Sequence, residues 1–201
     1  MMGVKISKGN IKMGSIPSVS LPAVLTCRGD CGCSSKCYAS RMERLRPNVR
    51  YSYLNNLRVL LTQPEAYWSG VEEQLKASDF FRFHVSGDIV DDTYFANMVG
   101  VAKRNPHCEM LCFTKKYSIV NDFLSAGGKI PDNLHIVLSG WRNLKMENPY
   151  NLPEAHVRFR DGITEARADA KECGGNCTEC ANTNGGCWTL KSGEQIVFNE
   201  H

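Results

Sequence analysis

Eight of the ten cysteines in this chain fall into two groups of four, and thiolates are strong ligands for soft metals. The first group spans eleven residues and consists of Cys27, Cys31, Cys33 and Cys37. Glycines and serines separate these thiols, and neither a helix nor a strand can direct four sulfurs so close in sequence to one point. The second group lies near the other end and consists of Cys173, Cys177, Cys180 and Cys187. The spacing predicts two ligating loops.

The two loops differ in their spacing. The first reads C-x3-C-x-C-x3-C, whereas structural zinc sites usually offer two short knuckles separated by a longer segment. This tight packing favours an iron–sulfur cluster, with zinc and a redox or purely structural thiol group as alternatives. If three of the four thiols ligate, one iron stays open to a substrate or cofactor. The second loop reads C-x3-C-x2-C-x6-C and fits either a second cluster or a structural zinc, with Trp188 as a packing lid. Cys108 and Cys112 are interpreted as small buried hydrophobic residues.

A further set of polar residues follows a predicted strand over residues 80–86. Alternation places Arg82, His84 and Ser86 on one face, and Gly87 and Asp88 come directly after them. The carboxyl ends of parallel strands are where ligands bind in α/β proteins, so we expect a ligand pocket there, with a solvated edge strand as the alternative. Lys115 and Arg142 follow the next two predicted strands. Their charges predict an anionic ligand such as a carboxylate or phosphate.

The elements that position these residues read as an α/β fold. Helices are expected over 38–45, over about 49–62, from Pro64, after Asp91 or Asp92 and from about Ser118. Strands are expected over 16–22, 80–86, 109–113 and 135–138, with weaker candidates at 156–159 and 195–198. The βαβαβ order implies parallel strands with right-handed crossovers. We expect a domain over residues 1–160 and a cysteine-rich extension over 161–201 that its ligated centre holds together and that packs on the domain.

Composition narrows the class of protein. The 201 residues carry a formal net charge of +3, too small to imply nucleic acid by itself, although Lys36, Arg41, Arg44, Arg46 and Arg50 gather after the first loop. These basic residues form either a solvated helix face or a patch that binds anions. No stretch has the length of a signal peptide's apolar core or of a membrane span, so we expect a cytoplasmic protein without membrane contact. In a reducing compartment clustered cysteines are metal ligands, whereas in a secreted protein they would be disulfides.

Several separated motifs in the same order resemble the phage gene product 88 family, whose members look like small radical S-adenosylmethionine enzymes. The resemblance covers roughly residues 9–188. It rests on Gly9-Asn-Ile-Lys-Met-Gly14, Ser20-Leu-Pro-Ala23, Thr26-Cys27, Cys33-x3-Cys37-Tyr-Ala39, Arg82-Phe-His-Val-Ser-Gly-Asp88, Phe113-Thr-Lys115 and Cys177-x2-Cys180 with Cys187-Trp188.

The resemblance implies a partial (β/α)6-type barrel with a [4Fe-4S] cluster at its mouth, an external electron donor, and S-adenosylmethionine cleaved to a 5′-deoxyadenosyl radical. A host-cytoplasmic location follows if the protein is phage-encoded. Gly87 and Asp88 would then hold the cofactor, with Arg82, His84, Lys115 and Arg142 lining the pocket. Radical enzymes typically use C-x3-C-x2-C, so here Cys27, Cys33 and Cys37 are taken as core ligands and Cys31 as a fourth ligand or a bystander. The substrate is not specified, a nucleic acid or nucleotide being one candidate. The competing hypotheses are a non-catalytic, metal-stapled module that binds nucleic acid or protein, and an electron-transfer protein.

Overall fold

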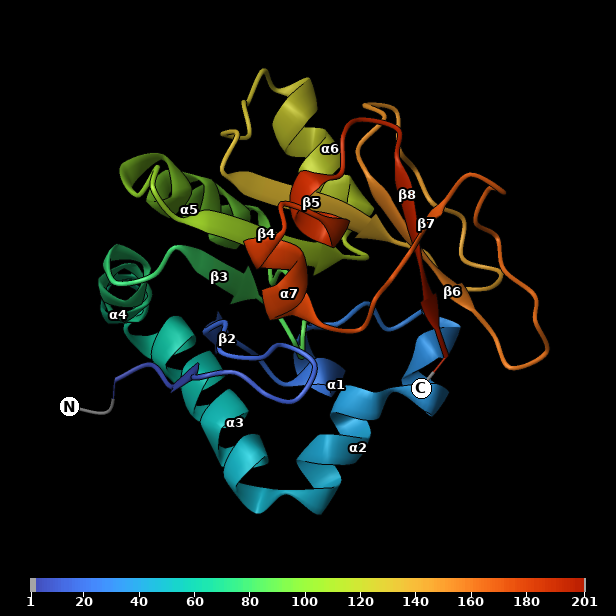
Figure 1. The fold of residues 1–201 in the computed structure, drawn as a ribbon. Helices are drawn as coiled ribbons and strands as arrows, with labels where there is room; N and C mark the ends of the chain where they lie inside the picture. Colours follow the sequence, from blue (N-terminus) through green and yellow to red (C-terminus); the bar gives the residue numbers. More distant parts are fainter. Residues whose placement is uncertain (1–2, 201) are drawn as a thin grey trace.

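The structure is a computed structural model that describes residues 3–200. Its elements alternate in the order expected of an α/β protein (Figure 1). The strands are β1 (Ile6–Ser7), β2 (Ser18–Val19), β3 (Phe80–Phe83), β4 (Glu109–Thr114), β5 (Leu134–Ser139), β6 (Glu154–Arg158), β7 (Lys171–Glu172) and β8 (Gln195–Asn199). The helices are α1 (Ala23–Thr26), α2 (Tyr38–Leu45), α3 (Pro47–Thr62), α4 (Pro64–Lys76), α5 (Asp92–Arg104), α6 (Tyr117–Ser125) and α7 (Cys177–Asn182), with 3-10 turns η1 (Gly32–Lys36) and η2 (Gly186–Thr189).

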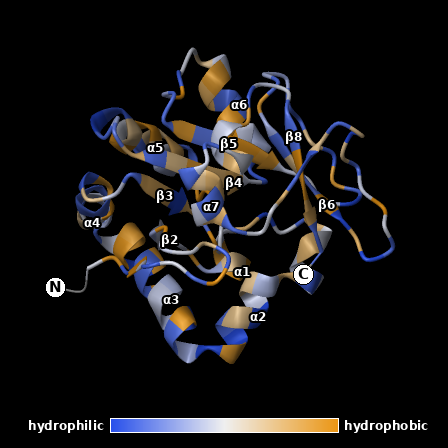
Figure 2. Ribbon diagram, in the orientation of Figure 1, coloured by the Kyte–Doolittle hydropathy of each residue, from blue (hydrophilic) through white to orange (hydrophobic). Residues whose placement is uncertain are grey.

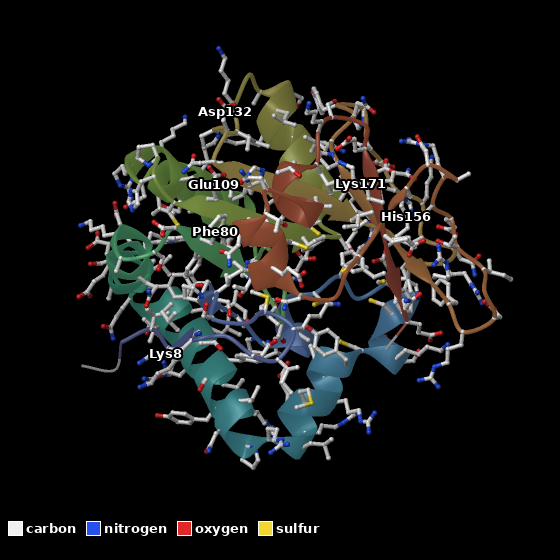
Figure 3. All side chains as sticks on the ribbon, viewed as in Figure 1. Lys8, Phe80, Glu109, Asp132, His156 and Lys171 are labelled. Carbon is white, nitrogen blue, oxygen red and sulfur yellow. The ribbon has the colours of Figure 1, made fainter. Side chains whose placement is uncertain are left out.

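All eight strands form one sheet in the order β1-β2-β3-β4-β5-β6-β8-β7. Every neighbouring pair is parallel except β1 with β2, which is antiparallel. Phe80 and Glu109, the first residues of β3 and β4, are paired and lie at the same end of the sheet (Figure 3). The expected α/β class with a largely parallel sheet is thus confirmed, and the carboxyl ends of β2 to β6 share one edge.

Local sequence signals explain where the helices begin. Pro47 and Pro64 occupy the first positions of α3 and α4, where a missing backbone N–H costs nothing. Asp91 caps α5, its side chain accepting a hydrogen bond of 2.7 Å from the Tyr94 backbone N–H. The Cys37 thiol caps α2 in the same way, accepting from the Ser40 N–H at 3.5 Å. The predicted range of α2 is confirmed at both ends.

The sheet separates two apolar cores. On one face β3, β4 and β5 direct Phe81, Phe83, Met110 and Ile136 against α3, α4, α5 and α6. On the other face Leu111 and Val137 pack with Trp188, Leu190 and other residues of the cysteine-rich C-terminal segment, and α7 lies over β4 in Figure 1. The segment from residue 161 onward therefore packs on the sheet and also adds β8 and β7 to it. Cys108 and Cys112 are fully buried in the first core, as expected.

Two strand predictions need correction. The strand expected over 80–86 ends at Phe83 because His84 has a positive φ of 59°, which breaks the alternation. The His84 ring therefore packs near Tyr94 on the helix-covered face, and Arg82, His84 and Ser86 do not share a face. The strand expected over 16–22 is only two residues long, at Ser18–Val19. Within residues 3–200, no helix combines the length and apolar character that crossing a membrane requires.

Candidate metal centre

Three of the four thiols of the first cysteine loop lie at the ends of short helices, and Cys33 lies within η1. Cys27 follows α1 in an extended conformation, Cys31 caps η1, and Cys37 separates η1 from α2. The sulfurs also accept backbone hydrogen bonds, at 3.4 Å from Cys33 N–H to Cys31 Sγ and at 3.5 Å from Ser40 N–H to Cys37 Sγ. Such N–H groups stabilise negative charge on a thiolate. Backbone N–H groups of the loop therefore face two of its four sulfurs, and the predicted role of the loop as a ligand stays a prediction.

The loop is fixed to the carboxyl edge of the sheet at four strands. After β3, Gly87 adopts φ +80°, and a Cβ there would lie 2.7 Å from both the Leu21 carbonyl oxygen and Thr26 Oγ1. After β4, the Lys115 carbonyl accepts a hydrogen bond of 3.5 Å from Arg28. These contacts hold the start of the loop directly above the ends of β3 and β4.

The rest of the loop reaches the later strands. A Cβ on Gly32 would lie 3.7 Å from the Trp141 indole nitrogen, after β5. Lys36 pairs at 2.8 Å with Glu200, after β8. The loop thus crosses the edge at which parallel sheets bind their ligands.

Asp88 connects the ends of β3 and β4. Its buried carboxylate accepts hydrogen bonds from Thr114 Oγ1 at 2.6 Å, from Ile89 N–H at 2.8 Å and from Lys115 N–H at 2.9 Å. Burial raises the pKa of this carboxyl group, and the three donors act against that rise. Both oxygens are therefore engaged by the protein, and a role of Asp88 toward a cofactor stays a prediction.

Lys115 supplies the positive charge near the thiols. Its ammonium donates to Ser139 Oγ at 2.9 Å and acts to lower the thiol pKa of Cys27, Cys31 and Cys33. Burial nevertheless raises the pKa of Cys27 to about 12, with further increases from Asp88 and Cys37. Of the two cations predicted for this rim, Lys115 thus acts electrostatically on three of the four thiols, and its role toward an anionic ligand stays a prediction.

Cys31 and Cys33 form a close pair. Their Sγ atoms are 2.7 Å apart, and the hydrogen bond between them lowers the pKa of Cys31 to about 6 and raises that of Cys33. Two thiolates on one tetrahedral zinc, with Zn–S bonds of about 2.3 Å, stand about 3.8 Å apart, and those on different irons of a cubane stand farther apart. As placed, these two sulfurs do not both ligate one centre.

The donor chemistry of the loop fits a thiolate-bound cluster or zinc, but the sulfur positions are those of free thiols. Across residues 3–200, no three His, Cys, Asp or Glu side chains stand in an arrangement ready to hold a metal ion. Binding therefore requires the side chains to rotate. The ligand assignments for Cys27, Cys31, Cys33 and Cys37 stay predictions.

The second loop covers the sheet face that packs against Trp188 and Leu190, at the end of the sheet where β3 begins. Cys173, Cys177, Cys180 and Cys187 are half-buried. Burial raises the pKa of the Cys180 thiol and raises that of Cys187 to about 12, and the neighbouring Cys173 and Cys177 add to both increases. Gly186 fits against Cys180, since a Cβ there would lie 2.8 Å from its Sγ. The predicted packing role of Trp188 is confirmed, with its ring 5.2 Å from that of Phe80 at the start of β3.

The N-terminal turn over residues 10–14 packs against this second loop. The Cys177 N–H donates to the Lys12 carbonyl at 2.9 Å, and Thr178 Oγ1 donates to the Met13 carbonyl at 2.9 Å. A Cβ on Gly14 would lie 2.0 Å from Thr178 Oγ1. The resemblance motif ending at Gly14 therefore has a packing role against α7.

The other predicted pocket residues are separated. Arg82 lies on the inner sheet face with its guanidinium 4.8 Å from the Phe113 ring centroid and 3.4 Å from Met13 Sδ, and its charge lowers the pKa of Cys187. His84 is buried on the other face. Arg142 pairs with Asp161 at 2.7 Å and stacks on Phe159. The structure thus brings Lys115 to the first loop and Arg82 toward the second.

One polar site lies outside the residues chosen from the sequence. Glu154, the first residue of β6, accepts hydrogen bonds from His156, labelled in Figure 3, at 3.0 Å and from Gln195 at 2.6 Å. These residues and the loop after β5 line a cavity of about 520 Å³, and no cysteine is among its lining residues. The available signal was the alternation of Glu154 and His156 in a weak strand. No feature of the sequence predicted that Glu154 of β6 would pair with Gln195 of β8.

The chain was compared with characterised proteins, with solved structures and with models of protein families. Neither characterised proteins nor solved structures gave a match to the chain. The model of the family described as Gene product 88 matches residues 4–187, which include both cysteine loops and the strands between them. The chain belongs to the phage gene product 88 family.

Proposed function

We propose that this protein is an iron–sulfur protein whose first cysteine loop holds a [4Fe-4S] cluster at the carboxyl edge of the sheet. One observation carries the proposal: the loop with the four thiols crosses the ends of β3, β4 and β5, where the charge of Lys115 acts to lower the pKa of Cys27, Cys31 and Cys33. A thiolate-ligated cubane is anionic, and a nearby cation and backbone N–H donors stabilise it. The C-x3-C-x-C-x3-C spacing is less typical of structural zinc sites, which usually use two short knuckles separated by a longer segment.

The proposed ligand set is the one that the resemblance implies. Cys27, Cys33 and Cys37 are the core ligands, and Cys31, whose Sγ lies 2.7 Å from that of Cys33, is a fourth ligand or a bystander. The second loop holds either a second cluster or a zinc ion through Cys173, Cys177, Cys180 and Cys187. Its burial against Trp188 supports a structural or electron-relay role.

The finer proposal is a radical S-adenosylmethionine enzyme built on a partial barrel. When bound, a reduced cluster with one open iron supplies the electron that cleaves S-adenosylmethionine. In this chain Lys115 orients an anionic group at the edge, and Ser139 fixes the Lys115 ammonium through the 2.9 Å hydrogen bond. Gly87 and Asp88 hold the loop and the ends of β3 and β4 in register beneath the cofactor.

The test is anaerobic incubation of the dithionite-reduced protein with S-adenosylmethionine, followed by chromatography for 5′-deoxyadenosine. We expect product from the natural chain, none from Cys33→Ser, and natural amounts from Ser34→Ala, a substitution in the same loop that removes no thiol. A cluster-loaded protein that yields no 5′-deoxyadenosine would contradict the enzyme proposal and favour an electron-transfer role. Zinc in both loops would favour the non-catalytic module.

A further inference from the structure

The cavity of about 520 Å³ lies where the connection between β5 and β6 meets the first residues of β6 and β8. This connection, residues 140–153, contains no helix, whereas α5 follows β3 and α6 follows β4. Loops lie beside β6 and β8 in Figure 1, and Figure 2 shows that these loops carry both hydrophilic and hydrophobic residues. Sites for small molecules usually measure roughly 300–1,000 Å³. The cavity is therefore large enough for such a ligand, and it shares no residue with either cysteine loop.

A network of hydrogen bonds around Glu154 forms one wall of this cavity. Asn148 Nδ2 donates to Glu154 Oε1 at 2.8 Å, and Gln195 Nε2 donates to Oε2 at 2.6 Å. The Arg167 N–H in turn donates to Gln195 Oε1 at 2.8 Å and fixes the orientation of that amide. Burial acts to raise the pKa of Glu154, but the hydrogen bonds from Asn148, His156 and Gln195 together lower it below its ordinary value. Glu154 is therefore a carboxylate whose two oxygens already have donors within the protein.

This network leaves one ring nitrogen of His156 for a ligand. A carboxylate only accepts hydrogen bonds, so the Nε2 that lies 3.0 Å from Glu154 carries a proton, and the neutral ring has its lone pair on Nδ1. Within the described residues 3–200, Nδ1 has no hydrogen-bond partner. A Cβ at Gly140 would lie 2.9 Å from Nδ1, so any larger residue there would cover this nitrogen. The buried ring thus presents a hydrogen-bond acceptor at the cavity.

The remaining walls of the cavity carry charge of both signs and an apolar strip. Glu165 and Lys145 are exposed, and Leu144 and Met146 are half-buried and pack against the first core. Together with Glu154 the lining holds two carboxylates and one ammonium group. This excess of negative charge disfavours an anionic ligand such as a phosphate or a carboxylate.

The free hydrogen-bonding groups define the class of ligand. His156 Nδ1 and the Glu165 carboxylate are acceptors, whereas the Lys145 ammonium is a donor. A hydroxyl group both donates and accepts, so neighbouring hydroxyls can satisfy acceptors and a donor at once. An amine would be repelled by Lys145 and would offer it no acceptor. The apolar strip suits the C–H face of a sugar ring.

We infer that this cavity binds a neutral molecule with neighbouring hydroxyl groups, either a free sugar or the ribose of a nucleoside, through His156 Nδ1, Glu165 and Lys145. Gly140 keeps Nδ1 uncovered, and Glu154 is a positioning residue that holds the ring in the tautomer with the proton on Nε2. The inference does not depend on a cluster in the first loop.

The test is NMR of ¹⁵N-labelled protein, read at the histidine ring nitrogens and the backbone amides. The chain has five histidines, and the signals of His156 are those missing from the spectrum of His156→Gln. We expect D-ribose, uridine or both to shift the His156 Nδ1 signal and the amide signals of residues 140–146. The analogue 2′,3′-dideoxyuridine lacks the neighbouring hydroxyls and should shift neither. Uridine replaces adenosine as the probe because the proposed S-adenosylmethionine site would itself bind adenosine.

Two substitutions test the assigned contacts. Glutamine has no acceptor at the Nδ1 position, and a Cβ at residue 140 covers that nitrogen, so His156→Gln and Gly140→Ala should each raise the dissociation constant of the probe about tenfold. Gly100→Ala is the matched control for Gly140→Ala, because a Cβ at Gly100 meets only the end of the Arg104 side chain, at 3.4 Å. It should bind as the natural chain does, and urea unfolding checks that each variant is folded.

Glu154→Gln tests the positioning role. The amide that replaces the carboxylate can donate to Nε2 as well as accept from it, so the spectrum should gain the signals of the tautomer with the proton on Nδ1. An unchanged tautomer in Glu154→Gln would contradict the role of Glu154.

The probes identify the ligand and separate this inference from the cluster proposal. A response to D-ribose alone indicates a free sugar, and a response to uridine alone indicates a nucleoside. Equal shifts with 2′,3′-dideoxyuridine, shifts with inorganic phosphate only, no shift with any probe, or natural affinity in His156→Gln would overturn the inference. Cys33→Ser changes no residue of the cavity and should bind the probe as the natural chain does. Iron-free protein that still binds D-ribose or uridine would refute the proposed function and support the cavity site.

Discussion

At the scale of single residues, the first cysteine loop depends on close contacts in which a larger side chain does not fit. Gly87 is predictable as a turn residue after a strand, but its close approach to Leu21 and Thr26 joins segments that are distant in sequence. The four thiols were identifiable from spacing alone. The 2.7 Å pairing of Cys31 with Cys33, by contrast, required coordinates.

Gly87→Ala should displace the loop and destabilise the fold. A Cβ would meet two oxygens at 2.7 Å and the residue would keep a positive φ, so we expect a loss of about 2 to 4 kcal/mol in unfolding free energy together with reduced iron content. Gly127→Ala is the matched control, because Gly127 has φ +82° and no neighbouring atom within 4 Å. It should lose only about 1 kcal/mol and keep its iron. Equal losses in urea unfolding would contradict the packing role.

His84 should make the fold sensitive to acid. Burial, with a smaller contribution from Arg82, lowers the pKa of His84 to about 3, below its ordinary value of 6.5. The unfolded chain therefore binds a proton that the folded chain excludes, and stability falls as pH drops from about 6.5 toward 3, by up to about 1.4 kcal/mol per pH unit.

The substitution that tests this is His84→Asn, since asparagine tolerates the positive φ at this position. Urea unfolding measured between pH 7 and pH 4.5 should show a shallower loss of stability in this variant. His107→Asn, which replaces an exposed ring, should follow the natural chain. An unchanged slope in His84→Asn would show that His84 is not the group responsible.

At the scale of elements, propensity and capping predicted the helices well and the strands less well. The bounds of α2 matched, and Pro64 and Asp91 marked the starts of α4 and α5, whereas α3 begins at Pro47, two residues before the expected start. The strand expected over 80–86 failed after Phe83 because His84 turns the chain. A pattern of alternating residues does not reveal a positive φ at one position. It therefore predicted that Arg82 and His84 share a face, although they lie on opposite faces of the sheet.

The hydrogen bond between Thr114 and Asp88 should stabilise the edge that carries the first loop. Thr114→Val removes the 2.6 Å donor to a buried carboxylate, and we expect a loss of about 1 to 3 kcal/mol in unfolding free energy. Thr93→Val, at an exposed position, is the control. Differential scanning calorimetry with unchanged melting temperatures for Thr114→Val would contradict a structural role for Asp88.

At the scale of the whole molecule, the sheet separates two kinds of packing. Helices α4, α5 and α6 bury one face through apolar stripes that the sequence displays, and this half of the fold was predictable. The other face is covered by the N-terminal segment and the second cysteine loop, which have few apolar residues of their own. The insertion of β8 between β6 and β7 could not be inferred, because it depends on long-range pairing of weak strands.

Trp188 tests whether the C-terminal segment is an integral part of the fold. Its buried ring packs against Phe80, and Trp188→Ala should cost about 3 to 5 kcal/mol in unfolding free energy. Trp141→Ala, at a half-buried ring near the first loop, should cost less. Equal losses in urea unfolding would mean that the second loop contributes little to the stability of the sheet.

The central claim is that the first loop holds an iron–sulfur cluster. The most direct measurement is iron, acid-labile sulfide and zinc per chain in anaerobically purified protein, with an electron paramagnetic resonance spectrum of the reduced form before and after adding S-adenosylmethionine. We expect about four irons with matching sulfide if only the first loop holds a cluster, or about eight if both do, and a spectrum that changes on addition. Zinc in both loops, or iron lost equally from Cys33→Ser and Ser34→Ala, would contradict it.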